Sequence, residues 1–311
     1  MSRERHLDFS DDESGVMGLT VVEPSPEGET PVEFKEDYFP SPPSSSSRSL
    51  TRTSTLGLGN HGPAYYLSRA QKYSSYAFTV FTSFHIANTA IIPLLTRSVP
   101  ESNRYLLLTR PYYQSALTEP LLIAVPLAVH ITSGIALRFY RRRQALTRYG
   151  AETHRDRKKI PWPTLSGTSA LGYALIPMAG IHLWTTRIFP VYMHSDNSMI
   201  SLSYISHGFA SHPLVSFAGF TAMITVGAWH FTWGWAKWAG LSPTQVSETE
   251  LEKHVVSKRR WYGINLVSAL VAALWLAGGL GIVGKDGKTG GWIGREYEEL
   301  YNSMPLIGRW R

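Results

Sequence analysis

Four histidines lie inside long apolar segments of the chain, at His85, His130, His182 and His230. Imidazole is a good metal ligand, and an ionisable side chain inside a hydrocarbon layer is costly unless it has a partner or a function. Each histidine stands in a different apolar segment, so a shared site would have to be assembled from several helices. A hydrogen bond between neighbouring helices is the simpler alternative for any one of them.

The expected helices place the four histidines at two depths. Consecutive membrane helices run in opposite directions and rise by 1.5 Å per residue. His130 and His230 then lie at a similar distance from one end of the bundle, and His85 and His182 lie toward the other end. The members of each pair belong to alternate helices, which face each other across a four-helix bundle.

This arrangement predicts haem b, in which two imidazoles bind the iron from opposite sides of a flat ring. Small residues close to the histidines would leave room for a porphyrin: Gly134, Gly180, Gly227 and Gly234. Cations near the segment ends could pair with haem propionates: Arg138, Arg187 and Lys237. In the alternative reading, the glycines mark close helix packing, and Arg138 and Lys237 extend to the membrane surface.

The elements that must position these residues are five apolar segments, each long enough to cross a hydrocarbon core of about 30 Å as a helix. We place them near residues 72–96, 114–140, 165–189, 212–237 and 261–283. Kinks are expected at Pro120, Pro126 and Pro177. The predicted fold is an all-α membrane protein with five transmembrane helices, of which the first four form a haem-type four-helix bundle. The transmembrane domain spans residues 65–285, and residues 286–311 form a short C-terminal tail.

The N-terminal part of the chain has a different composition. Residues 1–43 contain eleven acidic and three basic residues, a net charge of −8, whereas the whole chain carries +7. This part lacks the apolar core of a secretory signal and the basic character of a mitochondrial transit peptide. It cannot bury enough apolar surface to offset chain entropy, so residues 1–64 are predicted to be a disordered tail and linker. The absence of cysteine excludes disulfides, iron–sulfur clusters and covalently attached haem.

Loop charges predict the orientation of the membrane domain. Residues 141–159 contain eight Lys or Arg, and residues 253–260 contain four more. Both stretches lie on the side of the N-terminus, which the positive-inside tendency places in the cytosol, with the C-terminus on the far side. His194, His207 and His212 fall in one polar connection, where we expect solvated side chains, with a surface metal site as the alternative.

Four motifs occur in order along the membrane domain: HIANTAIIPLL, HITSGIALRFYRR, GIHLWTTR and WHFTWGWAKW. With them, roughly residues 65–285 resemble the fungal mitochondrial outer-membrane adaptor family Mcp (Mdm-ten-complementing protein). The membrane domain of that family is similar to the cytochrome b subunits of succinate and fumarate reductases, in which the same histidine pairing holds two haems. The resemblance implies a multi-pass protein of the outer mitochondrial membrane that acts in lipid homeostasis and is not an enzyme. Its C-terminus would face the intermembrane space.

The resemblance also implies a partner. Members of the family recruit a bridge-like lipid-transfer protein of the vacuolar-protein-sorting-thirteen family, which is associated with a Pro-x-Pro peptide preceded by spaced apolar residues. LTVVEPSP fits this pattern through Leu19, Val22, Pro24 and Pro26. A second peptide, EDYFPSPP at residues 36–43, has Lys35 where the first apolar residue would stand. Fixed φ angles at the prolines reduce the entropy lost when such a peptide docks.

The sequence is also compatible with two further functions. A di-haem bundle could act as a b-type membrane oxidoreductase or electron-transfer protein, although no quinone site or acid–base pair is evident. Alternatively, the bundle could accept or scramble membrane lipids beside the transfer protein, with the basic loop holding anionic headgroups.

Overall fold

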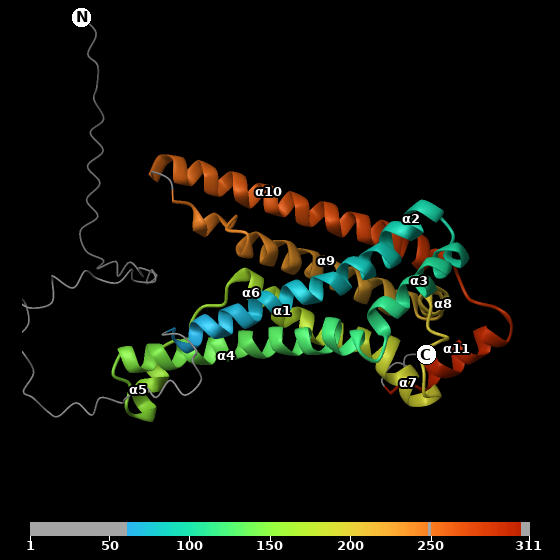
Figure 1. Ribbon diagram of the computed structural model, residues 1–311, viewed down its shortest axis with the longest axis horizontal. Coiled ribbons are helices and arrows are strands. Elements are labelled where there is room, and N and C mark those ends of the chain that lie inside the picture. Colours follow the sequence, from blue (N-terminus) through green and yellow to red (C-terminus); the bar gives the residue numbers. More distant parts are fainter. Residues whose placement is uncertain (1–60, 248–249, 306–311) are drawn as a thin grey trace, which may run out of the picture. The chain divides into compact units, whose positions relative to one another are not determined.

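The computed structural model describes residues 61–247 and 250–305, and every regular element in these ranges is a helix (Figure 1). The chain divides into two compact units, Met1–Gly59 and Asn60–Arg311, and all described residues belong to the second. Both Pro-x-Pro peptides, with Leu19, Val22, Pro24 and Pro26, lie outside the described residues. The all-α prediction is therefore confirmed for the part of the chain that carries the membrane segments.

The first predicted span is a continuous helical segment made of α1 (Pro63–Ile86), η2 (Ala87–Ile91) and α2 (Ile92–Thr96). Pro63 suits the start of a helix, where a backbone N–H is not needed, and Arg97 ends the segment with a left-handed backbone conformation. The segment begins nine residues before the predicted 72, because the polar sequence that precedes the apolar run also forms helix.

The connection that follows contains a helix that the sequence did not predict. The helix α3 (Val99–Gln114) is capped by the side chain of Ser98, and it lies at a steep angle to the long helices (Figure 1). The second span then consists of η3 (Pro120–Ala124) and α4 (Val125–Arg148). It starts later and ends later than the predicted 114–140, since the run of arginines after Tyr140 continues the helix.

The remaining elements complete the domain. A short helix, α5 (His154–Lys159), follows α4 and is capped by Thr153. The third predicted span corresponds to a continuous run of α6 (Gly167–Leu183), η4 (Trp184–Ile188) and α7 (Phe189–His194). The later elements are α8 (Leu202–Ser211), α9 (Pro213–Trp238), η5 (Pro243–Gln245), α10 (Glu250–Leu276), η6 (Ala277–Ile282), η7 (Val283–Lys285) and α11 (Gly291–Ser303).

Four helical segments in the described ranges are long and apolar enough to cross a membrane: Pro63–Thr96, Pro120–Arg148, Pro213–Gln245 and Glu252–Lys285. They correspond to the first, second, fourth and fifth predicted spans. The α6–α7 segment is not among them, because His182, Arg187 and neighbouring threonines lower its hydropathy. A fifth crossing therefore stays a prediction.

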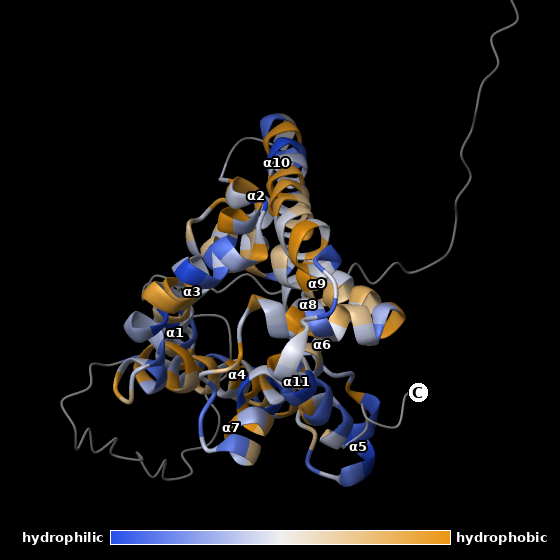
Figure 2. Cartoon of the chain, turned by 90° about the vertical axis from the view of Figure 1, so that its right-hand side faces the viewer, coloured by the Kyte–Doolittle hydropathy of each residue, from blue (hydrophilic) through white to orange (hydrophobic). Residues whose placement is uncertain are grey.

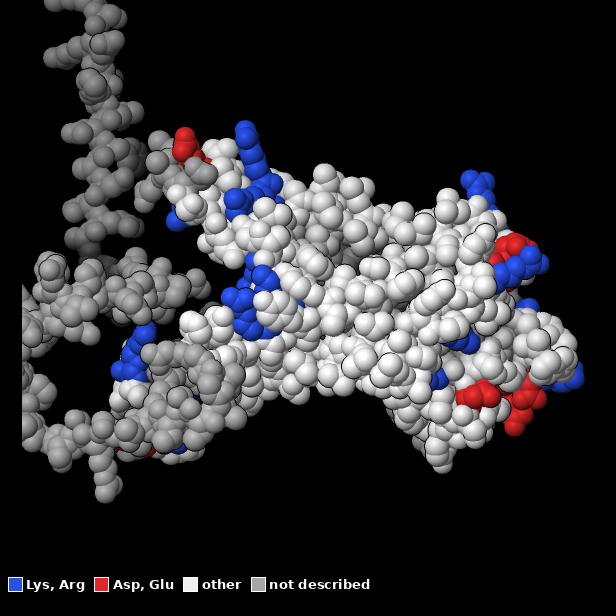
Figure 3. All heavy atoms as spheres, viewed as in Figure 1, with Lys and Arg blue, Asp and Glu red and all other residues white. Residues whose placement is uncertain are grey.

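The long helices bury little of their apolar surface within the protein. The main packing partners are α1 with α4, α6 with α9, and α9 with α10. Leucines on the outer faces, such as Leu121, Leu214 and Leu266, are exposed. The middle of the face in Figure 3 carries no charged side chain, and apolar residues cover much of α9 and α10 in Figure 2. An exposed apolar surface of this extent is typical of helices surrounded by lipid.

The end of the domain opposite the start of α1 is closed by short helices. Residues from α7, α8, α11 and the adjoining loops form a buried cluster: Phe189, Ile200, Tyr204, Tyr297, Leu300 and Met304. Arg110 of α3 donates hydrogen bonds to the carbonyl oxygens of Asn197 and Ile200, and Asn103 donates to Ser203. Much of the predicted C-terminal tail is thus a packed helix, α11, whose apolar face lies on α8.

Four π-helical segments occur in the described helices, at η2, η3, η4 and η6. A π-turn inserts one residue into an α-helix and changes the direction in which the following side chains point. The segments η2 and η6 pack directly against each other, and a Cβ added at Gly278 of η6 would overlap the carbonyl group of Ala90. Glycine at this position therefore allows two backbones to approach closely.

Gly278→Ala is expected to destabilise the domain by about 1–3 kcal/mol, because the new methyl group forces η2 and η6 apart. The measurement is the melting temperature of the purified protein in detergent. Gly263→Ala in α10 is the matched control, since a Cβ there meets no atom within 4 Å. Equal melting temperatures for the two variants would contradict the close contact.

Candidate functional site

The structure brings together the two histidine pairs that the depth argument predicts. His130 of α4 and His230 of α9 have ring centres 6.1 Å apart, with ring planes at 83°. Their Nδ1 atoms lie 3.2 Å from the carbonyl oxygen of Gln71 and 2.9 Å from that of Thr168. Carbonyl oxygens only accept hydrogen bonds, so both imidazoles carry the proton on Nδ1 and leave Nε2 as a free lone pair.

The second pair joins α1 and α6. The ring centres of His85 and His182 are 5.9 Å apart, and the ring planes cross at 65°. Aromatic rings surround the pair, with Phe81 and Trp275 against His85 and Phe220 against His182. The Nδ1 atom of His182 is buried and has no hydrogen-bond partner. This pair therefore lies in a more apolar environment than the pair of His130 and His230.

The spacing of both pairs fits a metal ion held between two imidazoles. Metal–nitrogen bonds of about 2 Å place the centres of two such rings roughly 6 Å apart. No group of three or more histidine or acidic side chains in the described ranges is arranged to bind a metal ion. An ion at either pair would thus need further donor atoms, which the four pyrrole nitrogens of a haem supply.

The predicted propionate partners are all partly engaged by the protein. Arg138 donates to the carbonyl oxygen of Pro163 at 3.1 Å and lies over the ring of Trp162. Lys237 lies over the ring of Trp238. Arg187 forms two hydrogen bonds with the carboxylate of Glu119, one of them 2.7 Å long. The sequence offered no sign of this ion pair beyond the presence of one acidic residue at the start of a span.

The glycines near the histidines have different surroundings. A Cβ on Gly172, which the sequence analysis did not single out, would lie 2.7 Å from Cε1 of His230. A Cβ on Gly134 would lie 2.7 Å from Nε2 of Gln71, whose backbone carbonyl accepts from His130. Added Cβ atoms at Gly180 and Gly234 would meet no atom within 4 Å, and one at Gly227 would approach only Leu175. Gly134 and Gly172 therefore leave the space in which the pair of His130 and His230 is held.

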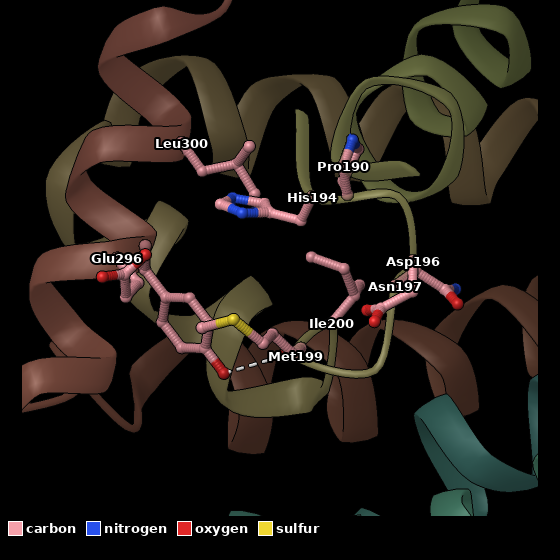
Figure 4. A pocket seen from close by; sticks show the side chains of 9 residues that line it. Pro190, His194, Asp196, Asn197, Met199, Ile200, Glu296 and Leu300 are labelled. Carbon is pink, nitrogen blue, oxygen red and sulfur yellow. Dashed lines mark hydrogen bonds between the residues drawn. The ribbon is translucent and has the colours of Figure 1, made fainter. Parts of the chain in front are cut away.

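A small cavity lies at the far end of the domain, between α7, the loop after it and α11 (Figure 4). His194, Asp196, Asn197 and Glu296 are among its lining residues. Its volume is about 10 Å³, which is room for one water molecule. Hydrogen bonds from the N–H and hydroxyl of Ser198 lower the pKa of Asp196, so this carboxylate is already used by the turn.

His207 is buried, contrary to the expectation of a solvated side chain, because the predicted loop forms α8 beneath α11. Its Nδ1 accepts from the N–H of Thr289, which leaves the proton on Nε2, and Nε2 donates to Glu298 at 2.9 Å. The hydrogen bond from His207 lowers the pKa of Glu298, and the charge of Lys288 lowers it further. His207 therefore links α8, α11 and the loop that joins η7 to α11, and only the three-dimensional structure reveals this role.

Long helices with exposed apolar faces, histidine pairs between them and a closed far end define a multi-pass helical membrane protein. Residues 177–288 match the family model described as MDM10-complementing protein 1, transmembrane domain. The matched residues include the GIHLWTTR and WHFTWGWAKW motifs, and they confirm the Mcp family predicted from the sequence. This part of the chain is thus similar to the transmembrane domain of MDM10-complementing protein 1, and the match does not indicate an enzyme.

Comparison with curated proteins gave no match, and neither did comparison with solved structures. The likeness to the cytochrome b subunits of succinate and fumarate reductases stays a prediction.

The far end is expected to loosen in acid through Glu298. The pKa of the Glu298 carboxyl group is lowered on folding, so its charged form stabilises the folded protein at pH values above the pKa of the unfolded chain, near 4.3. This contribution is lost as the pH falls through the pKa of the folded state. Hydrogen-exchange protection of α11 should therefore decrease as the pH falls from about 5 down through the folded pKa of Glu298. Glu298→Gln should show reduced protection already at the higher pH. Exposed Glu299→Gln is the control and should behave like the wild type; a Glu298→Gln profile equal to the wild type would refute this role.

Proposed function

We propose that the protein is an adaptor of the outer mitochondrial membrane that acts in lipid homeostasis. It recruits a bridge-like lipid-transfer protein of the vacuolar-protein-sorting-thirteen family to a membrane contact site. The observation that carries this proposal is the match of residues 177–288 to the transmembrane domain of MDM10-complementing protein 1. The long apolar helices support a permanent membrane anchor, as an adaptor requires.

In this proposal the N-terminal part of the chain binds the partner. LTVVEPSP supplies an extended peptide in which Leu19 and Val22 fill apolar pockets and Pro24 and Pro26 restrict the backbone. The EDYFPSPP peptide at residues 36–43 is the second candidate. Either peptide precedes the membrane helices in the sequence, and the membrane domain then needs only to hold the chain in the correct membrane.

The charge distribution supports a cytosolic N-terminus. Within residues 61–247 and 252–305, the end at which α1 begins carries sixteen Lys or Arg and only three acidic residues, Glu152, Asp156 and Glu252. The opposite end carries seven of each sign. The positive-inside tendency assigns the basic end to the cytosol and the helix α11 to the intermembrane space. The peptide that precedes Pro63 would then begin on the side from which a cytosolic partner arrives.

Replacement of both Pro24 and Pro26 by alanine is expected to abolish recruitment of the lipid-transfer protein to mitochondria. The cause is the loss of the restricted backbone that lowers the entropic cost of docking. The measurement is co-localisation of the tagged partner in cells, with mitochondrial targeting of the variant as an internal check. Replacement of Pro40 and Pro42 is the matched control and should leave recruitment unchanged. Full recruitment by the first variant would reject residues 19–26 as the binding peptide.

A second candidate function rests on the histidine pairs. The ring separations of 5.9 and 6.1 Å suit two haem b groups, and a bound haem supplies one-electron redox chemistry. His130 and His230 would hold one group and His85 and His182 the other, while the carbonyl groups of Gln71 and Thr168 keep the first pair correctly oriented. Arg138 and Lys237 lie toward the basic end and Arg187 toward the other, where they could approach propionates. The protein would then be an electron-transfer protein as well as an anchor.

The purified protein is expected to show a reduced-minus-oxidised difference spectrum of the b type. Loss of one ligand should remove one of two groups, so His130→Ala and His85→Ala should each lower the signal by roughly half. His154→Ala, a substitution on the exposed helix α5, is the control. A colourless, iron-free preparation would end the haem hypothesis and leave the adaptor hypothesis intact, because recruitment depends on the N-terminal peptide.

A further inference from the structure

The end of α4 carries two arginines, Arg143 and Arg148, whose guanidinium donors have no partner among the described residues. Tyr140, Arg143, Gln144, Thr147 and Arg148 line one open groove, and their spacing places them along one broad side of the helix, with Arg143 and Arg148 at its two edges. Arg143 and Arg148 are exposed, and within the described ranges neither guanidinium forms an ion pair or a hydrogen bond. Among the described residues no carboxylate lines the groove, so the chemistry of this helix face favours an anion.

Other cations at the same end have structural partners. Arg142 is buried and donates to the carbonyl oxygens of Arg157, Ile160 and Pro161, which fixes the loop after α5. Arg260 donates to the carbonyl oxygen of Gly240 in the turn after α9. The arginines of the α4 groove differ from these because their donors are free for a ligand.

The groove lies at the level of lipid headgroups. Phe139 is 60% exposed and its ring contacts that of Trp162, as expected of aromatic residues at the membrane boundary. Arg143 follows one helical turn later, about 6 Å further along the axis. The headgroup layer on each side of a bilayer is of similar thickness, roughly 5–7 Å. Arg143 therefore falls within the layer that contains the phosphates.

The direction of the helix decides where these side chains reach. Each Cα–Cβ bond in an α-helix tilts toward the N-terminus of the helix. Since α4 runs out of the membrane at this end, Arg143 and Arg148 lean back toward the lipid. In contrast, α10 runs into the membrane from the same end, so Lys258 and Arg259 lean toward solvent. Two sets of exposed cations at one end thus differ in their access to headgroups.

We propose that the groove on α4 binds the phosphate of an anionic phospholipid in the leaflet at the basic end of the protein. The C-terminal end of a helix by itself repels an anion, so binding depends on the guanidinium groups of Arg143 and Arg148. The hydroxyl of Tyr140, which accepts from Gln144, can donate its own proton as an additional contact. This inference goes beyond the adaptor function and holds whether or not residues 19–26 recruit a partner.

The test uses native mass spectrometry of the full chain, purified in detergent and titrated with phosphatidic acid or phosphatidylcholine. Arg143→Gln combined with Arg148→Gln is expected to weaken retention of phosphatidic acid by about tenfold or more, since each cation near a membrane surface contributes about fivefold. Lys258→Gln combined with Arg259→Gln removes the same charge at the same end and should change retention by less than about threefold. Phosphatidylcholine should bind weakly and equally to all three proteins.

Three outcomes would overturn the proposal. Equal losses in both double variants would indicate diffuse attraction to the basic end rather than a site on α4. Unchanged retention in the α4 variant would place the anionic lipid elsewhere. Displacement of phosphatidic acid by an equal concentration of inorganic phosphate would show that the groove is a site for free phosphate and not for a lipid headgroup. The melting temperature of each variant, compared with the wild type, verifies that the surface substitutions leave the fold intact.

Discussion

Polar groups inside a hydrocarbon layer are costly unless they find partners within the protein, and this constraint shapes the half of the bundle that holds His130 and His230. The rings of His130 and His230 meet it through backbone carbonyl groups of α1 and α6. Each histidine thereby ties its own helix to a neighbour, and the two rings also face each other across the bundle. Helix positions in this half of the bundle are fixed by polar contacts that water would weaken and lipid does not.

The need for partners is also met differently by the charged side chains at the two ends of the domain. At the basic end, arginines that lie close to the helices donate to loop carbonyl groups, as Arg142 does, while the outer cations stay free. At the far end, charges of opposite sign pair with each other, as in Arg187 with Glu119 and Lys288 with Glu298. One end is thus electrostatically open to anions, and the other is balanced and closed by α8 and α11.

The features that depend on periodicity and depth could be predicted from the sequence. Apolar runs in the sequence located four of the long helices. The assumption that consecutive helices run in opposite directions with a constant rise per residue was enough to pair His130 with His230 and His85 with His182. Features that depend on contacts distant in sequence could not be predicted. The helices α3 and α11 are too short and too polar to give a membrane signal, and each is stabilised by packing on α8. His207 appeared solvated for the same reason, because nothing local reveals that α11 covers it.

The π-helical segments and the ion pair of Arg187 with Glu119 also could not be predicted from the sequence. A π-turn differs from an α-turn by one residue in the hydrogen-bond register, and no residue type specifies it. The sequence did locate Arg187 near the membrane boundary, yet Glu119 stands 68 residues earlier and the two meet only because η3 and η4 end up adjacent. Boundaries shifted for a related reason, since helices such as α4 continue past the point where lipid ends.

The closed far end has a consequence for the biogenesis of the protein. Its core is assembled from residues of α3, α8 and α11, and α11 follows all the other described helices along the chain. A ribosome that has completed α10 has therefore produced the membrane helices but not the element that covers His207 and Tyr204. The packing of the far end must therefore wait until α11 has been synthesised. Formation of the long apolar helices and completion of the far-end core are consequently separate steps in the folding of this domain.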